Sequence, residues 1–339
     1  MHQKLIPPRR LRRALGAAAI LGVLTLCVAA GALRFSSTAG ADSTTCADTV
    51  TTAPTGPATV SVETKAPFGN VLVIGSGQYD GCSLYLLTSD QLHGMTGAHY
   101  ACSDNFNAIG QPCDTFLWPA LLTQGAPIAG PGVNAKLLGT VTRTDLPGLG
   151  AVQQVTYAGM PLYRFFLDES SNETEGANLF DPVTSPTGIW YLIEPSRGNP
   201  APGPAQLQPE TAPVARGADA TVLSATMNED FSLFSDASFP VYTRGHGNGP
   251  GGGCDEMCAQ YWPPVLTAGR PAAAGGVDQH ALGTKKRPDG TQQVTYRGEP
   301  LYLFADDAYI PGLPYGSAGI NGAGADTIWG VFDTIPPAH

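Results

Sequence analysis

The chain has 339 residues, of which 42 are glycine and 30 are proline, while charged residues make up only 14%. This composition favours turns and short strands over helices, so we expect an all-β protein with few short helices. Residues 1–41 hold six of the 18 basic residues and none of the 28 acidic ones, which leaves a net charge of −16 on the remainder. Such an acidic remainder excludes nucleic acid as an expected partner.

The N-terminus has the layout of an export signal. Basic residues up to Arg13 precede an apolar run over 14–33, and Ala39-Gly40-Ala41 offers a small-residue cleavage site. The run is also long enough to cross a membrane, so cleavage and retention as an N-terminal anchor both remain open. Cys27 has the place of a lipidation site, although the large Leu26 before it disfavours a lipoprotein. We expect an exported protein, extracellular or in the cell envelope, with membrane attachment through 14–33 as an option.

Residues 42–65 are rich in Thr, Ser, Ala and Pro, a composition typical of a disordered spacer. After the spacer, one segment occurs twice. Residues 153–165 return as 292–304 with only three of thirteen positions changed, and Trp118 and Trp190 match Trp262 and Trp329. The chain therefore contains two copies of one domain, which we place at 66–195 and 218–339. The proline-rich residues 196–217 between them are expected to be a linker.

Short β-branched or aromatic runs separated by Gly and Pro predict the strands of each copy. In the first copy they lie at 70–74, 83–88, 137–142, 152–157, 161–166 and 189–193, and in the second at 280–284, 291–296, 300–304 and 328–332. Because Gly159 and Gly298 lie in the short gaps after 152–157 and 291–296, each gap predicts a hairpin with glycine at a positive φ. A helical turn is expected at 255–261, before Pro263.

Six cysteines follow the export signal, and in an oxidising compartment they are expected to form three disulfides. Cys102 and Cys113 precede Trp118 as Cys254 and Cys258 precede Trp262, so each pair is expected to close the same loop of its copy. Cys46 and Cys82 remain for the third bond.

The same loop of the second copy offers a different chemistry. His246, Cys254, Met257 and Cys258 form a soft ligand set that suits copper or zinc, or an envelope redox protein. The first copy spaces its cysteines by eleven residues, which a structural disulfide tolerates and a metal site does not. We therefore expect no metal and no cofactor, and keep the metal site as the alternative.

Each copy also carries the motif Tyr-x-Phe-x-x-Asp, with Tyr163 and Asp168 in the first and Tyr302 and Asp307 in the second. Two interpretations are open: a core aromatic pair followed by a turn-capping aspartate, or a phenol and carboxylate at the rim of a binding pocket. Trp118 and Trp262 are likewise either core residues or sugar-stacking platforms.

No catalytic constellation accompanies these candidates. The six histidines never fall at metal-ligand spacing, and a Gly-x-Ser-x-Gly elbow is absent. An enzyme is therefore the less expected outcome, and the sequence names no catalytic residue.

The cysteine loop with its Trp-Pro-Pro, the Leu-Gly-Thr tripeptide and the Gln-Gln-Val-Thr-Tyr-x-Gly-x-Pro-Leu-Tyr-x-Phe stretch with its trailing Asp resemble the bacterial secreted-repeat lipoprotein family of unknown function. The resemblance implies export and a small β-domain in tandem, but no substrate or catalytic residue. The first copy departs from the pattern in its expanded cysteine loop and in Ala120 for the second proline. We expect a non-enzymatic binding or structural protein whose two copies suit bivalent contact with an envelope or extracellular ligand or protein.

Overall fold

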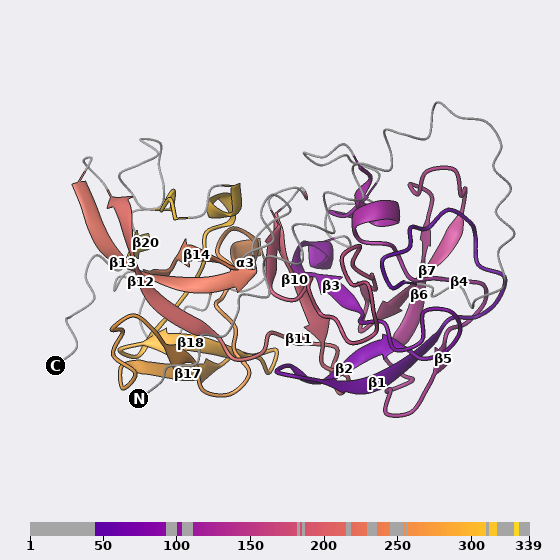
Figure 1. Cartoon of the computed structure of the whole chain (residues 1–339), viewed down its shortest axis with the longest axis horizontal. Helices are drawn as coiled ribbons and strands as arrows, with labels where there is room; N and C mark the ends of the chain where they lie inside the picture. The colour runs from indigo at the N-terminus through magenta and orange to yellow at the C-terminus, as the bar shows by residue number, and fades with distance from the viewer. Residues whose placement is uncertain are drawn as a thin grey trace, which may run out of the picture. The chain divides into compact units, whose positions relative to one another are not determined.

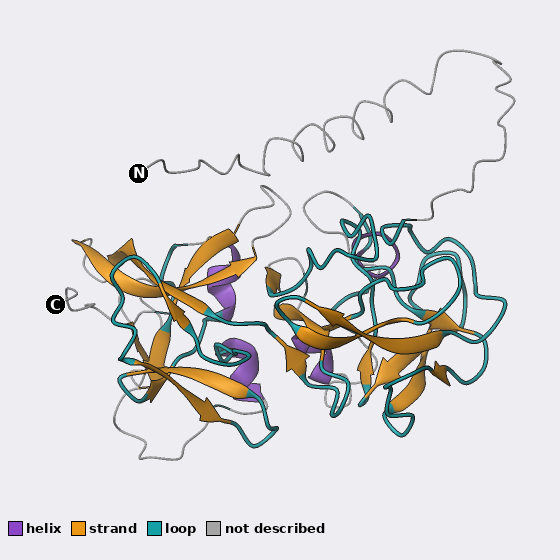
Figure 2. Cartoon of the chain, turned by 60° about the horizontal axis from the view of Figure 1, so that its bottom comes forward, coloured by secondary structure: helices purple, strands orange, loops and turns teal. Residues whose placement is uncertain are grey.

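The structure, a computed structural model, describes residues 45–92, 100–103, 111–181, 184, 187–214, 218–228, 236–244, 254, 257–309, 312–316 and 329–331. The described chain consists of short strands and long loops with a few helical turns (Figure 2), which confirms the predicted all-β class. The expected export signal lies outside the described residues.

The first copy contains eleven described strands and two helical segments. They are β1 (Thr59–Lys65), β2 (Gly69–Ile74), β3 (Tyr85–Leu87), η1 (Thr88–Leu92), η2 (Cys113–Leu117), β4 (Leu122–Thr123), β5 (Ile128–Ala129), β6 (Leu138–Arg143), β7 (Val152–Tyr157), β8 (Met160–Pro161), β9 (Leu179–Asp181), β10 (Gly188–Ile193) and β11 (Pro200–Ala201).

The second copy repeats most of this order. Its described elements are β12 (Gln206–Val214), β13 (Ala218–Asn228), β14 (Asp236–Pro240), β15 (Tyr242–Arg244), α3 (Met257–Tyr261), β16 (Ala272–Ala273), β17 (Leu282–Lys286), β18 (Gln292–Tyr296), β19 (Glu299–Pro300), η4 (Ala305–Tyr309) and β20 (Trp329–Val331). The β6-β7-β8 hairpins correspond to β17-β18-β19, and both copies place a helical segment just before their tryptophan.

The hairpin turns after β7 and β18 have the same backbone. Ala158 and Gly159 have φ values of 50° and 85°, and Arg297 and Gly298 have 52° and 85°. Two consecutive positive φ values match the right-handed twist of the flanking strands, which is why short hairpins use such turns. Glycine occupies its expected position, and a non-glycine residue precedes it in the left-handed region in both copies.

The strands predicted at 161–166 and 300–304 shorten to the two-residue β8 and β19. Beyond β8, successive backbone amides turn to different partners: Leu162 donates to Val155, Tyr163 to Tyr85, and Arg164 to Pro119. Because no single neighbour runs alongside, the residues pair one at a time and form no continuous ladder.

Two segments expected to lack regular structure instead contain strands, so that expectation was wrong for them. Residues 59–65 of the spacer form β1, which pairs with β2, and residues 206–214 of the linker form β12, which pairs with β13 (Figure 1). Each is the first strand of its copy, and each also pairs in parallel with a two-residue strand, β5 or β16. The Thr, Ser and Pro composition masks these strands, although Val60 and Leu207 are fully buried.

One eight-stranded sheet contains strands of both copies, in the order β11-β10-β9-β13-β12-β16, with β3 paired to β10 and β14 to β13. Its halves meet where Leu179 pairs in parallel with Asn228. Phe180 of the first copy packs edge-on against Phe239 of the second, with ring centroids 5.1 Å apart. A single buried hydrophobic cluster therefore includes residues of both copies.

Candidate functional site

The aspartate of the first Tyr-x-Phe-x-x-Asp motif lies in the protein interior. Asp168 is 1% exposed, and its Oδ2 accepts a hydrogen bond from Tyr85 Oη at 2.7 Å. Its Oδ1 accepts one from the backbone amide of Glu175 at 2.8 Å. The motif tyrosine, Tyr163, is fully buried and donates to Asp90 Oδ2 at 2.9 Å. The aspartate therefore ties β3 to a later loop, whereas its own motif tyrosine contacts a different carboxylate.

The second copy repeats this arrangement. Asp307 is fully buried, and its Oδ2 accepts from Tyr242 Oη at 2.6 Å while its Oδ1 accepts from the amide of Tyr315 at 2.8 Å. Tyr302 is 2% exposed. Tyr85 and Tyr242 were missed in the sequence, although both occupy a short apolar run ahead of the cysteine loop, and this shared position was the available signal.

Burial changes the proton affinity of these carboxyls. It raises the pKa of Asp168 to about 7 and that of Asp307 to about 8, against the lowering effect of the tyrosine and backbone hydrogen bonds. Burial also raises the pKa of Asp90 to about 6. A buried carboxyl with few opposite charges favours its neutral form, so these groups hold protons well above the usual pH range of aspartate.

Both candidate tryptophans belong to the core. Trp118 is fully buried and stacks on Trp190 with ring centroids 3.7 Å apart and an interplanar angle of 8°. Trp262 is 8% exposed and packs edge-on against Tyr242 at 5.3 Å. Gly176 lies so close to Trp118 that an added Cβ would come within 2.6 Å of the ring. Neither indole presents a free face to a ligand. Together with the two motif tyrosines and the two motif aspartates, all six candidate binding residues are therefore buried in the interior.

The structure contains three disulfides, Cys46–Cys82, Cys102–Cys113 and Cys254–Cys258, which are the expected pairs. The third bond joins the two sulfurs on which the metal alternative depends, and a sulfur in a disulfide is no thiolate ligand. Among the residues described, no cluster of three or more His, Cys, Asp or Glu side chains has metal-site geometry. His246 lies outside the described residues.

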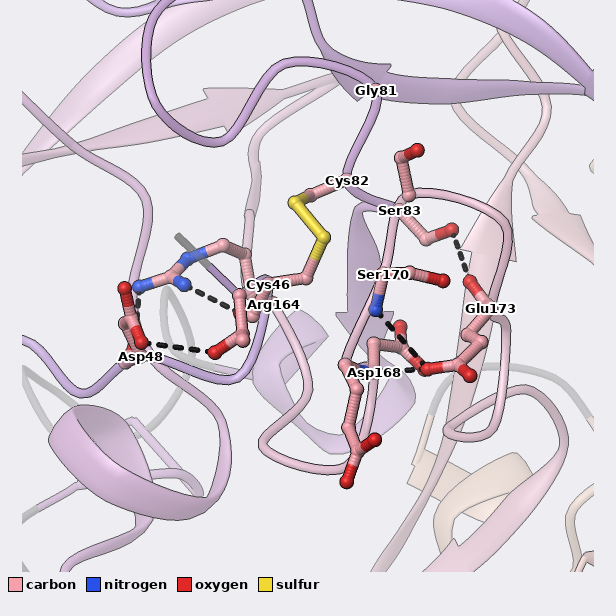
Figure 3. The surroundings of a disulfide bond; sticks show 12 residues. Cys46, Asp48, Gly81, Cys82, Ser83, Arg164, Asp168, Ser170 and Glu173 are labelled. Carbon is pink, nitrogen blue, oxygen red and sulfur yellow. Dashed lines mark hydrogen bonds between the residues drawn. A yellow bond between two sulfur atoms is a disulfide. The ribbon is translucent and has the colours of Figure 1, made fainter. Parts of the chain in front are cut away.

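The Cys46–Cys82 bond fastens the N-terminal arm, residues 45–50, to the first copy, and a buried arginine assists it (Figure 3). Arg164 is 2% exposed and donates to the carbonyl oxygens of Cys46 at 2.5 Å and Asp48 at 2.7 Å. The second copy has Leu303 at the equivalent position, so this clamp is specific to the first copy.

Replacing Cys46 and Cys82 together with serine is expected to lower the free energy of unfolding by about 2–4 kcal/mol, because the bond closes a long loop in the unfolded chain. Denaturant unfolding of the full chain measures the loss. The variant Arg164→Leu, which copies the second repeat, tests the arginine separately and should leave the disulfide intact. Equal stability of the double serine variant and the parent would contradict the expected role of the bond.

A buried arginine in the first copy was not foreseen from the sequence. Arg143, at the end of β6, has no exposed surface, and its guanidinium donates to Gln154 Oε1 at 2.5 Å and to the carbonyl oxygen of Cys102 at 2.9 Å. Two carboxylates pair with it: the fully buried Asp114 at 2.9 Å and the part-exposed Asp145 at 2.7 Å.

The second copy keeps the core of this network. Arg287 is 9% exposed and donates to Gln293 Oε1 at 2.9 Å and to the carbonyl oxygen of Cys254 at 3.1 Å. Its basic neighbours Lys285 and Lys286 are exposed. The repeated Gln-Gln pair, whose second glutamine faces inward in both copies, was the signal for this network. In each copy, the hydrogen bonds of the buried arginine fasten the cysteine loop to the central hairpin.

A cleft of about 900 Å³ lies between the copies and is lined by both of them. The first copy contributes Ser89 and Asp90 of η1 and Ile189 of β10, and the second contributes Gln260 of α3 and the turn at 288–291. Figure 1 shows α3 beside β10 at this place. The volume falls within the range of known ligand pockets, about 300–1,000 Å³.

Two polar atoms in the walls of the cleft have unused hydrogen-bonding capacity. Ser89 is 4% exposed, and its Oγ has no hydrogen-bond partner among the described residues. On the other wall, Gln260 Nε2 is buried and likewise lacks an acceptor within the described part of the chain. Asp90, next to Ser89, is 3% exposed and connects the cleft to Tyr163. Buried polar atoms are normally paired, so these two are the candidate hydrogen-bonding contacts for a ligand in the cleft.

Residues 197–199 hold the two walls together. Asn199 Nδ2 donates to the carbonyl oxygen of Asp289 at 2.9 Å. Gly290 has a φ of 95°, and an added Cβ there would come within 2.5 Å of Arg197 Nη1. The segment after β10 therefore lies directly against the compact turn of the second copy.

Residues 283–332 match the family model described as a secreted repeat of unknown function, which confirms the resemblance predicted from the sequence and agrees with the expected export. The match runs from β17 to β20, that is, the part of the second copy that follows β16. No curated protein and no solved structure matches the chain.

No helix in the described residues has the length and apolar character needed to cross a membrane. The candidate anchor at 14–33 lies outside those residues.

Proposed function

We propose that this exported protein is a non-enzymatic binding protein of the cell envelope or extracellular space, and that it holds its ligand in the cleft between its two repeats. The observation that carries the proposal is the cleft itself, because both copies line it and its walls contain two buried polar atoms without a described partner. The repeated Tyr, Asp and Trp residues are buried and form the framework of each copy. They are therefore not available to a ligand, which leaves the cleft as the candidate site.

A shared cleft gives the duplication a different use from bivalent binding. The copies contribute unlike parts to it: η1, β10 and a hairpin turn from the first, and α3 and the 288–291 turn from the second. One ligand therefore contacts both repeats at a single site. The N-terminal arm, clamped by Cys46 and Arg164, would connect this site to the envelope if residues 14–33 remain attached.

The two hairpin turns offer a matched test. Ala158 lines the cleft, whereas Arg297, its equivalent, does not, and its guanidinium lies over the Tyr296 ring at 5.4 Å. Because Arg297 adopts a φ of 52° and Ala158 one of 50°, arginine fits the backbone of the first turn. The variant Ala158→Arg is therefore expected to fold and to place a long charged side chain at the mouth of the cleft.

The full chain is mixed with separated polysaccharide, lipid and protein fractions of the host envelope, and the amount bound is measured. We expect binding to one fraction, at least a tenfold loss of affinity in Ala158→Arg, and unchanged affinity in Arg297→Ala. Thermal unfolding confirms that both variants are folded. Binding that is equally strong in Ala158→Arg, or no binding to any fraction, would refute the proposal.

A further inference from the structure

We infer that the ligand of the cleft is a neutral oligosaccharide. This inference rests on the proposed function and specifies the chemistry of the same site. Three properties of the walls lead to it: their charge balance, their unused hydrogen-bonding groups and the paired state of the strand that lines them.

The charged side chains described in the lining of the cleft balance each other. Two are acidic, Asp90 and Asp289, and two are basic, Arg197 and Arg287. Arg287 Nε lies 3.8 Å from Asp289 Oδ2, so that arginine already has a counter-charge. The exported part of the chain is strongly acidic as a whole, which repels phosphorylated, sulfated or carboxylated chains. The site therefore favours an uncharged ligand.

The polar atoms of the walls favour a ligand rich in hydroxyl groups. Ser89 Oγ both donates and accepts hydrogen bonds, and Gln260 Nε2 donates them. A sugar hydroxyl also does both, so one kind of group on the ligand satisfies either wall. An apolar ligand would leave both atoms desolvated and unpaired, which weakens binding. Met160, Ile189 and Leu266 line the same cleft and offer apolar contact to the C–H faces of sugar rings.

A peptide strand is the main competing ligand, and the sheet does not provide for it. Peptides that bind by strand addition need an unpaired strand edge. Ile189 and Tyr191 of β10 line the cleft, but β10 pairs with β3 along one edge and with β9 and β11 along the other. Its backbone groups are therefore already used, and a ligand contacts side chains here.

The test uses the full chain and immobilised neutral oligosaccharides of two to six units, composed of glucose, galactose, mannose or N-acetylglucosamine. Acidic oligosaccharides and peptides of similar mass are measured in parallel. We expect at least one neutral oligosaccharide to bind at least tenfold more tightly than any acidic one or any peptide. Ser89→Ala and Gln260→Leu should each weaken that binding about five- to tenfold, Ala158→Arg should weaken it more, and Arg297→Ala should not change it.

The outcomes separate the ligand class from the site. Preference for an acidic oligosaccharide or a peptide, lost in Ala158→Arg, would overturn the neutral ligand and leave the cleft as the binding site. Neutral sugar binding that is unaffected by Ser89→Ala, Gln260→Leu and Ala158→Arg would overturn the cleft as the binding site. Absence of binding to every neutral oligosaccharide in the panel would overturn the inference itself.

Discussion

Replacing Arg143 with leucine is expected to lower the free energy of unfolding by about 3–5 kcal/mol. The guanidinium and the Asp114 carboxylate are both fully buried, 2.9 Å apart, so loss of the arginine leaves a buried charge without its main counter-charge. The carbonyl oxygen of Cys102 and Gln154 Oε1 also lose a donor. Urea unfolding of the full chain measures the loss.

The second copy supplies the matched control. Arg287 makes the same bonds to a glutamine and a cysteine carbonyl, but Ala259 occupies the position of Asp114. Arg287→Leu is therefore expected to cost only about 1–3 kcal/mol. The double variant Arg143→Leu with Asp114→Leu should recover part of the loss, because it removes the orphaned charge. Equal losses in Arg143→Leu and Arg287→Leu, or no recovery in the double variant, would contradict this account.

The protein is expected to be more stable at pH 5 than at pH 8. Asp90, Asp168 and Asp307 have pKa values raised by burial to about 6, 7 and 8, against about 3.9 in an unfolded chain. Between these limits the folded state binds more protons than the unfolded state, so stability falls as pH rises. Their contribution is complete below pH 4 and is lost as pH passes 6 to 8. A tenfold change in proton affinity corresponds to about 1.4 kcal/mol. Because all three aspartates contribute, the free energy of unfolding should fall by at least about 2 kcal/mol between pH 5 and pH 8.

Unfolding by urea at several pH values between 4 and 8.5 tests this dependence. Asp307→Asn resembles the protonated side chain and should flatten the curve above pH 6, while the exposed Asp306 next to it provides Asp306→Asn as a control that leaves the slope unchanged. Burial also raises the pKa of Glu210, which acts in the same direction. A stability that rises between pH 5 and pH 8 would show that the three aspartates are ionised in the folded protein.

The repeated segments of the sequence were sufficient to predict the parts of the fold that local spacing determines. The hairpins at 152–161 and 292–300 and the pairs Cys102–Cys113 and Cys254–Cys258 follow from residues close together in one copy and repeated in the other, and Cys46–Cys82 was the pair that remained. The first strands, β1 and β12, did not follow, because their Thr-, Ser- and Pro-rich composition resembles a spacer and only tertiary pairing with β2 and β13 makes them strands.

The sequence indicated a core role for the motif residues of each copy as one interpretation, but it did not indicate their hydrogen-bond partners. The trailing aspartates were recognised, yet neither interpretation of the motif named the tyrosines that donate to them. The hydrogen bonds from Tyr85 and Tyr242 span 83 and 65 residues, respectively, and no local pattern contains such distances. The cleft was beyond prediction for the same reason, since its walls come from both copies and depend on how they pack.

The Cys46–Cys82 bond has a mechanical consequence. Along the backbone, 36 residues separate the two cysteines, but the sulfur bridge connects them directly. Cys82 is followed within seven residues by Ser89, at the wall of the cleft. A pulling force applied between residues 45–50 and the cleft wall would therefore pass through the disulfide and the short β3 strand and bypass the β1–β2 hairpin. The bond fixes the N-terminal arm to the folded protein at Cys82, so a pull on the arm would not peel β1 from its sheet.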